Sequence, residues 1–216
     1  MINPIRIKAH WPIYRSFDWG YFRPFSCGWW TVDDDGVIYR ILELYGVQHS
    51  GQDVIPNQGV KWTPEKVFSE IQKMEHEHPY LAGKKIFGIA DPAIWDAETG
   101  ISFAETAQKY GLFFKPGDNK RIPGWMQMHY RMMFDENGFP QMYIFKTCKD
   151  FIRTIPTLQY DEHKAEDLDT EGEDHIADET RYFCMSRPIT PHIDEPENLP
   201  LWGGDPLNMY EGRGRR

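Results

Sequence analysis

The sequence predicts a mixed α/β domain in which an antiparallel meander is followed by parallel strands and the sheet is flanked by helices. Three apolar segments with strand-like composition come first, and the turn signal Asp34-Asp35-Gly36 joins the second segment to the third. Strand-like and helix-like segments then alternate. This alternation is typical of strands that run parallel to the first one, with helices on the faces of the sheet.

The strands are expected at residues 13–20, 25–32, 37–45, 84–90, 112–115 and 141–146. Residues 46–62 are expected to form a loop. Asp18 and Asp91 each close an apolar run. Because ligands bind outside the carboxyl ends of the strands in open α/β sheets, these two positions mark the expected site.

Capping residues predict where the helices begin. Thr63-Pro64 starts a helix that should end near His78-Pro79. Capping pairs predict three further helix starts: Ser102 with Glu105, in a helix closed by Gly111, Thr147 with Asp150, and Thr170 with Glu173.

A stripe of large side chains predicts one more helix. Trp125, Met128, His129, Met132 and Met133 repeat at helical spacing. We interpret the stripe as core in preference to a platform for stacking bases, because its period is that of a buried helix face.

Length and composition predict one domain, residues 1–187, followed by a Pro/Gly-rich C-terminal tail, residues 188–216. The 216 residues are 40% hydrophobic, which is enough for a sizeable core. The tail has no periodic pattern and is expected to be extended or disordered unless a partner orders it.

The chain has no apolar run of about 18 residues and no signal peptide, so we expect a soluble protein that is not secreted and has no membrane partner. Cys27, Cys148 and Cys184 lack close C-x-x-C spacing. This argues against a disulfide framework and a structural zinc site, and predicts buried thiols in a reducing compartment.

The net charge of −9 weakly opposes nucleic-acid binding, because phosphate contacts dominate such binding. The charge is concentrated, however. Residues 161–179 contain ten acids and one base, Lys164, so the rest of the chain is neutral. Metal ions and nearby basic residues would have to offset this segment before a polyanion approached.

Three acidic signatures far apart in the chain carry the candidate chemistry: Asp18 in SFDWG, Asp91 in GIADPAIW, and Asp174, His175 and Asp178 in EDHIADETRY. In the third, residues three or four apart share a helix face. Carboxylates converging from two strand ends and a helix suit a hard cation, Mg²⁺ or Mn²⁺. The plainer alternatives are turn residues at the first two positions and a solvated acidic helix start at the third.

A pair of such ions, roughly 3.5 to 4 Å apart, hydrolyses phosphodiesters in other proteins, so the chain is predicted to cut nucleic acid. Repulsion between the carboxylates should raise some of their pKa values and strain the metal-free site. We therefore expect metal to stabilise the fold. His175 is either a ligand or a residue that positions the attacking water.

Further residues are weaker candidates. Glu43 is either an outer-shell residue of the site or a surface strand position. Lys115, Lys120, Arg121 and Arg131 either reach phosphates or form a solvated surface.

Several segments in this order resemble the nuclease domain of the large terminase subunit of tailed bacteriophages. They lie between Trp11 and Arg187: SFDWGYFRPFSCGWW, YRILELYG, GIADPAIW, DNKRIPGW, FKTCKDFIRTIPTL and EDLDTEGEDHIADETRY. The resemblance implies a ribonuclease H-like fold. It also implies an endonuclease that uses Mg²⁺ or Mn²⁺ to cut concatemeric double-stranded viral DNA in the host cytoplasm at the start and end of head filling.

On the matching positions, the resemblance makes Asp18, Asp91 and Asp178 the metal-binding acids, supported by Asp174 and His175. It suggests a DNA contact for Arg121, next to Lys120. The implied partners are an ATPase motor domain, a small terminase subunit and the portal or prohead, which the tail would contact. The chain lacks the G-x-x-x-x-G-K-[ST] loop of the motor, so the nuclease is either an excised domain or a separate polypeptide.

Three other functions remain as alternatives. A resolvase-like nuclease of the same fold would prefer branched over linear DNA. A packaging or assembly adaptor would have an inactive acidic cluster and would gain no stability from divalent ions. A hydrolase of small phosphoesters ranks last, because the sequence shows no pocket for such a substrate.

Overall fold

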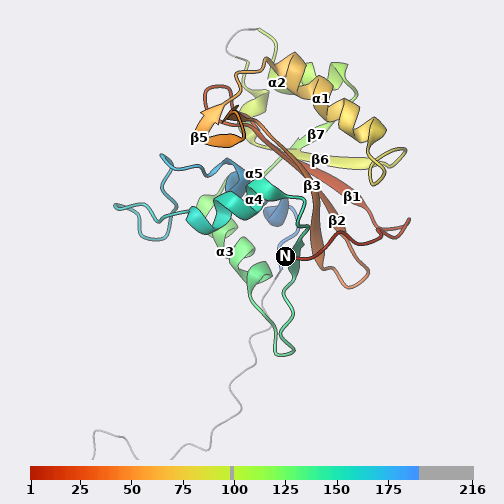
Figure 1. The fold of residues 1–216 in the computed structure, drawn as a ribbon, viewed down its shortest axis with the longest axis vertical. Helices are drawn as coiled ribbons and strands as arrows, with labels where there is room; N and C mark the ends of the chain where they lie inside the picture. Colours follow the sequence, from red (N-terminus) through yellow and green to blue (C-terminus); the bar gives the residue numbers. More distant parts are fainter. Residues whose placement is uncertain (98–99, 190–216) are drawn as a thin grey trace, which may run out of the picture.

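A six-stranded mixed sheet forms the centre of the protein, as the sequence predicts (Figure 1). This computed structural model describes residues 1–97 and 100–189. The strand order is β7-β6-β1-β2-β3-β8. The meander consists of β1 (Ile13–Asp18), β2 (Ser26–Val32) and β3 (Ile38–Tyr45), which pair antiparallel. Three strands join in parallel: β6 (Ile86–Ala90) beside β1, β7 (Phe114–Pro116) beside β6, and β8 (Met142–Ile144) beside β3.

Helices cover both faces of this sheet. One face carries α1 (Pro64–Glu77) and α2 (Phe103–Lys109), and the other carries α3 (Arg121–Met132), α4 (Lys149–Thr154) and α5 (His175–Met185) (Figure 1). Side chains of a strand alternate between faces. Phe17 therefore packs on Phe68 of α1 with ring centroids 5.5 Å apart, whereas its neighbour Ser16 donates a hydrogen bond to Glu179 of α5.

The predicted turn and two of the predicted caps are confirmed. Gly36 has a φ of +83°, which suits the turn between β2 and β3. Thr63 caps α1, and Ser102 with Glu105 forms the capping box of α2. Two short 3₁₀ helices complete the elements: η1 (Pro92–Trp95) and η2 (Ile155–Thr157).

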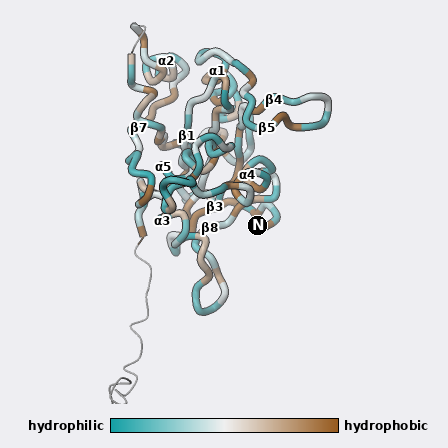
Figure 2. Tube along the Cα trace, turned by 90° about the vertical axis from the view of Figure 1, so that its left-hand side faces the viewer, coloured by the Kyte–Doolittle hydropathy of each residue, from teal (hydrophilic) through white to brown (hydrophobic). Residues whose placement is uncertain are grey.

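The prediction of a loop at residues 46–62 is wrong. Strands β4 (Val47–Ser50) and β5 (Asp53–Gly59) form a hairpin there, with Gly51 at a φ of +63° in its turn. The hairpin projects from the body of the molecule, as does the connection from α3 to β8 (Figure 2). Because much of the hairpin is solvated, its sequence lacks the apolar alternation by which strands are recognised.

Two other predicted caps are wrong, because side chains from elsewhere in the fold replace local ones. Cys148 occupies the N-cap of α4 without a side-chain hydrogen bond. Glu43 of β3 accepts the hydrogen bonds instead, from the backbone N–H of Asp150 at 2.7 Å and of Phe151 at 3.2 Å. Helix α5 begins at His175, whereas a cap at Thr170 would have started the helix several residues earlier. Glu173 does not complete a cap. It accepts hydrogen bonds from Arg153 at 2.8 Å and from the hydroxyl of Tyr45 at 3.0 Å.

The stripe in α3 is buried less than predicted. Met128 is buried, whereas His129, Met132 and Met133 are exposed. The face of α3 that packs against α5 consists of Gly124, Met128 and Arg131. A helix that rests on another helix buries a narrower strip than one that lies across a sheet, so part of the apolar pattern faces solvent.

The core lies between the sheet and its helices and contains large aromatic side chains, Trp29, Trp30 and Phe17 among them. Cys27, Cys148 and Cys184 are free and buried, as predicted. Within the described ranges, no helix has both the length and the apolarity to cross a bilayer. Of the predicted tail, residues 190–216 lie outside the described part of the chain.

Candidate active site

Asp18 and Asp91 lie side by side at the carboxyl ends of neighbouring parallel strands. Asp18 is the last residue of β1, and Asp91 directly follows β6. The backbone N–H of Asp91 donates to the carbonyl oxygen of Phe17 at 3.0 Å. The expected role of Asp91 in a turn is also observed, because its carboxylate accepts a hydrogen bond from the N–H of Ala93 at 3.0 Å in η1.

The start of α5 brings the third signature to the same place. Nδ1 of His175 lies 3.1 Å from a carboxylate oxygen of Asp18. Asp178 follows one helical turn after Asp174, the N-cap of the helix. The charges of Asp178 and Asp91 both act on Asp18. Side chains from β1, β6 and α5 thus share one electrostatic neighbourhood, and below we call Asp18, Asp91, Asp174 and Asp178 the acid cluster.

Burial and repulsion between carboxylates make two members of the acid cluster, Asp18 and Asp174, retain protons. Burial raises the pKa of Asp18 to about 7, and the charges of Asp178 and Asp91 add to this effect while the hydrogen bond with His175 opposes it. Burial, followed by the charge of Asp178, raises the pKa of Asp174 to about 6. Burial alone would lower the pKa of His175, but the hydrogen bond with Asp18 and the charges of Asp18, Asp174 and Asp178 together outweigh burial, and the pKa is raised. A positive charge near these groups is therefore favourable.

Arg121, at the start of α3, supplies part of that charge. Its guanidinium lies 2.8 Å from Asp167, 3.1 Å from Asp178 and 3.6 Å from Asp174. In this conformation, its ion-pair partners are these carboxylates, and it also donates to the carbonyl oxygen of Leu168 at 3.3 Å. Lys120, the other candidate for a DNA contact, is exposed and lies 3.7 Å from Asp118.

The carboxylates of the acid cluster are chemically suited to a divalent cation. Their side chains would have to change conformation to bind one. In residues 1–97 and 100–189, no three His, Cys, Asp or Glu side chains already stand in an arrangement that could hold a metal ion. The carboxylate of Asp178 is turned toward Arg121 and toward Arg181, which it meets at 2.7 Å. Carboxylate oxygens are the ligands that Mg²⁺ and Mn²⁺ prefer, and the crowded carboxyls favour a cation.

Two of the weaker candidates lie away from the acid cluster. Glu43 is neither a surface residue nor a contact of these acids, because its side chain is only 8% exposed, caps α4 and lies 3.4 Å from Arg40. Arg131 is buried and donates to the backbone oxygen of Arg187, so the prediction that it reaches phosphates is wrong.

Glu179 of α5, which the sequence patterns did not single out, lies in the protein interior. Its carboxylate is fully buried and lies 2.6 Å from Arg40. It also accepts hydrogen bonds from Ser26 at 3.1 Å and Trp30 at 3.3 Å. Gly28 leaves room for this pair, since a Cβ there would lie 2.4 Å from Arg40 and 2.5 Å from Glu179. The one signal in the sequence was Ser16, two residues before Asp18 and therefore on the same face of β1.

Solved structures of large terminases share this fold. The large terminase of a thermophilic bacteriophage matches with a TM-score of 0.62 and 20% identity, over 85% of this chain and 42% of that one. The P22 large terminase nuclease domain matches with a TM-score of 0.57 and 15% identity, over 86% of both chains. The fold is that of a terminase nuclease domain. It is ribonuclease H-like, as the sequence predicts.

The chain spans less than half the length of the thermophilic phage protein. No protein-family model matches its sequence, and no curated protein matches it significantly. The likeness is therefore one of fold, and the chemistry must be argued from the residues of this chain.

Replacing Arg121 by Ala should lower the unfolding free energy of the metal-free protein. It should also increase the stabilisation that divalent ions provide. The substitution leaves Asp174 and Asp178 without the guanidinium that partly neutralises them. We expect the unfolding free energy in EDTA to fall by about 1–3 kcal/mol, which corresponds to roughly 2–10 °C in melting temperature. Thermal melts with and without Mn²⁺, and Lys120→Ala as the control, measure the effect. An equal Mn²⁺ shift in Arg121→Ala and the wild type would show that the arginine and the cation do not compete.

The metal-free protein should lose stability as the pH rises toward neutrality. The folded pKa values of Asp18 and Asp174, about 7 and about 6, lie above the ordinary value of 3.8. A carboxyl with a raised folded pKa stabilises the fold below its ordinary pKa, and that contribution is lost as the pH rises through the folded value. Denaturant unfolding between about pH 4 and pH 7 should show the fall. The fall should be smaller in Asp18→Asn, and an equally steep fall in that variant would contradict the assignment.

Proposed function

We propose that the chain is the nuclease of a viral DNA-packaging terminase, a metal-dependent endodeoxyribonuclease that cuts concatemeric viral DNA. The observation that carries the proposal is the meeting of Asp18 and Asp91 at adjacent strand ends, opposite His175 and Asp178 of α5. The shared fold of the P22 nuclease domain supports the same class of activity.

In this proposal, Asp18, Asp91 and Asp178 hold two Mg²⁺ or Mn²⁺ ions, and Asp174 supports them. When bound, such ions supply Lewis-acid activation of water and stabilise the charge that develops on the leaving 3′ oxygen. His175 uses Nδ1 to contact Asp18, so Nε2 is assigned to positioning the attacking water. If bound ions neutralised Asp174 and Asp178, Arg121 would be able to pair with a phosphate of the substrate.

The acidic segment before α5 is less repulsive to DNA than its sequence indicates. Arg23 lies 3.2 Å from Glu171, and Arg153 lies 2.8 Å from Glu173. Arg121 pairs with Asp167 of the same segment. Arginines from other parts of the fold therefore offset some of the charge that opposed nucleic-acid binding.

The proposed partners follow from the terminase assignment. They are double-stranded viral DNA, an ATPase motor domain, a small terminase subunit and the portal or prohead, met in the host cytoplasm. Solved structures of the thermophilic phage terminase include complexes with ADP and with ATP-gamma-S, and this chain spans about two fifths of those proteins. The motor function is accordingly assigned to a polypeptide segment other than these 216 residues.

Cleavage of supercoiled plasmid tests the proposed activity. The purified chain should nick and linearise plasmid in Mn²⁺ or Mg²⁺ and be inactive in EDTA. Asp91→Asn should be inactive, whereas the control Glu162→Gln, an exposed acid of the same acidic segment, should keep wild-type activity. Cleavage in EDTA, or full activity of Asp91→Asn, would refute the assignment. A strong preference for a four-way junction over linear duplex would instead indicate a resolvase-like nuclease.

A further inference from the structure

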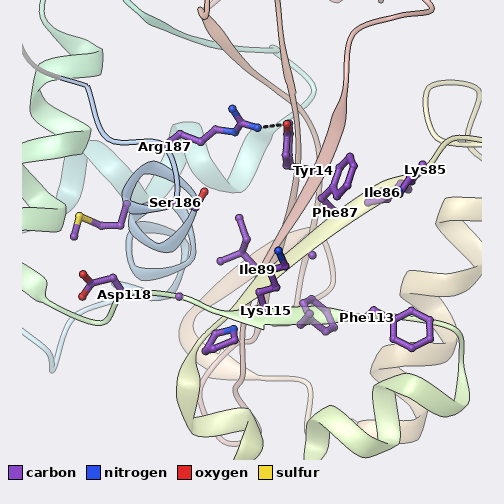
Figure 3. Close-up of a pocket in the computed structure, with 15 residues that line it drawn as sticks. Tyr14, Lys85, Ile86, Phe87, Ile89, Phe113, Lys115, Asp118, Ser186 and Arg187 are labelled. Carbon is purple, nitrogen blue, oxygen red and sulfur yellow. Dashed lines mark hydrogen bonds between the residues drawn. The ribbon is translucent and has the colours of Figure 1, made fainter.

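A groove of about 950 Å³ lies on the α5 side of β6 and β7 (Figure 3). Phe87 and Ile89 of β6 and Lys115 of β7 line it, and Tyr14 and Arg187 lie at its side (Figure 3). The strand register pairs Tyr14 with Phe87 and Ser16 with Ile89. Alternation therefore puts the groove on the face of the sheet that also carries Asp18.

This face is open because α5 packs over β1 and β2, toward the middle of the sheet, while β7 is a short strand at its edge. Among the described residues, no helix crosses β7 on this side (Figure 1). The last turn of α5 and the residues after it, Met185, Ser186 and Arg187, form the opposite wall.

One end of the groove lies beside the strand end that precedes Asp91. The N–H of Gly117, which lines the groove, donates to the carbonyl oxygen of Ala90 at 2.8 Å. Ala90 is the residue directly before Asp91. Tyr182 of α5 packs against Gly117, where a Cβ would lie 2.8 Å from its ring. The end of the groove at Gly117 is therefore next to the backbone that leads into Asp91.

The lining combines cations with exposed aromatic rings. Lys85 and Lys115 are exposed, and Phe87 and Phe113 are 43% and 66% exposed. Nζ of Lys85 lies 5.1 Å from the centroid of the Phe87 ring. Arg187 stacks on the Tyr14 ring at 4.0 Å and donates a hydrogen bond to its hydroxyl. Asp118 is the single acid among the lining residues.

We propose that this groove binds one unpaired strand of the nucleic-acid substrate, next to the scissile phosphate. The inference rests on the proposed nuclease function and adds the path of the strand. Lysines that follow a backbone, interleaved with aromatic faces on which bases stack, are the features by which proteins hold single strands. The volume lies within the range of about 300–1,000 Å³ that accommodates small ligands, which leaves room for a few nucleotides of one strand.

Fluorescence anisotropy with a labelled oligothymidylate tests the groove without cleavage, in EDTA and at low ionic strength. Phe113→Ala should weaken binding about five- to tenfold, because one stacked base is lost. Lys115→Ala should lower the salt dependence by about 0.7 in log–log slope, the value for one phosphate contact on a single strand. The controls are Phe139→Ala, whose ring is 61% exposed on the α3–β8 connection, and Lys73→Ala, exposed on α1 at the other face. Both should bind within about twofold of the wild type.

A blunt duplex of the same length separates the possible results. Losses confined to the single strand, or to a duplex with a frayed end, support the proposal. Wild-type affinity in both Phe113→Ala and Lys115→Ala overturns it, as expected if a protein segment is the true occupant, and so does an equal loss for blunt duplex. Plasmid cleavage by the same preparations keeps the two proposals apart. If the protein cleaves plasmid but the groove variants bind the oligonucleotide like the wild type, only the proposal for the groove is refuted. If the wild type does not cleave plasmid but its binding depends on the groove residues, only the proposed nuclease function is refuted.

Discussion

Asp178→Asn should reduce plasmid cleavage in Mn²⁺ by about a thousandfold or more. Asp178 is the acid that α5 contributes opposite the strand-end pair, and its charge acts on Asp18. A Lewis acid lowers such a barrier by several kcal/mol, and each 1.36 kcal/mol corresponds to a factor of about ten in rate. Asn has almost the same shape and still accepts hydrogen bonds from Arg121 and Arg181, so the fold should persist.

Asp167→Asn is the matched control for that experiment. Asp167 lies 2.8 Å from the same guanidinium, Arg121, but precedes α5 and is not part of the acid cluster. We expect it to retain activity within about tenfold of the wild type. Initial rates of supercoil loss, measured beside circular dichroism spectra, compare the two variants. A fully active Asp178→Asn, or equal losses in both, would mean that the carboxylate serves Arg121 rather than a cation.

Glu179→Ala should destabilise the protein by about 3–5 kcal/mol, the usual cost of breaking a buried ion pair by removing one partner. Arg40 is fully buried and would keep its charge without the carboxylate at 2.6 Å. The N–H of Trp30 and the hydroxyl of Ser26 would lose an acceptor as well. A loss of this size is a large part of the stability of an ordinary domain.

Urea unfolding monitored by tryptophan fluorescence measures the loss. Glu179→Gln keeps the shape and the acceptor oxygen and should cost less than Glu179→Ala, while Glu162→Ala on the surface should stay within about 0.5 kcal/mol of the wild type. If Glu179→Ala unfolds during purification, the smaller effect of Glu179→Gln still reports on the pair. A wild-type midpoint for both Glu179 variants would contradict the account of this buried network.

The sequence was sufficient to predict the sheet and the placement of Asp18, Asp91 and His175 near one another, because both follow from local rules. The apolar runs that end in Asp18 and Asp91 are neighbouring parallel strands, so their carboxyl ends place these two residues side by side. The spacing of His175 and Asp178 requires only a helix, and the helix forms. Ser102 with Glu105 is a cap made within four residues, so it too was predictable.

The features that the sequence did not reveal depend on partners distant in the chain. Glu43 caps α4, which lies about a hundred residues later in the chain. No local sequence pattern indicates that a distant side chain takes the place of a local cap. Glu179 looks like one more acid of a solvated helix start, and only the packing of α5 on β1 and β2 reveals a buried ion pair with Arg40. Arg121 resembled a DNA contact, but in the fold it approaches three carboxylates.

A crystal structure of the protein soaked in Mn²⁺ tests the central claim most directly, because the anomalous signal of manganese identifies the ion. The account predicts Mn²⁺ within about 2.5 Å of carboxylate oxygens from Asp18, Asp91 and Asp178 together, with Asp178 turned away from Arg121. Manganese bound elsewhere, or a cluster in which Asp178 stays paired with Arg121 at saturating Mn²⁺, would contradict it.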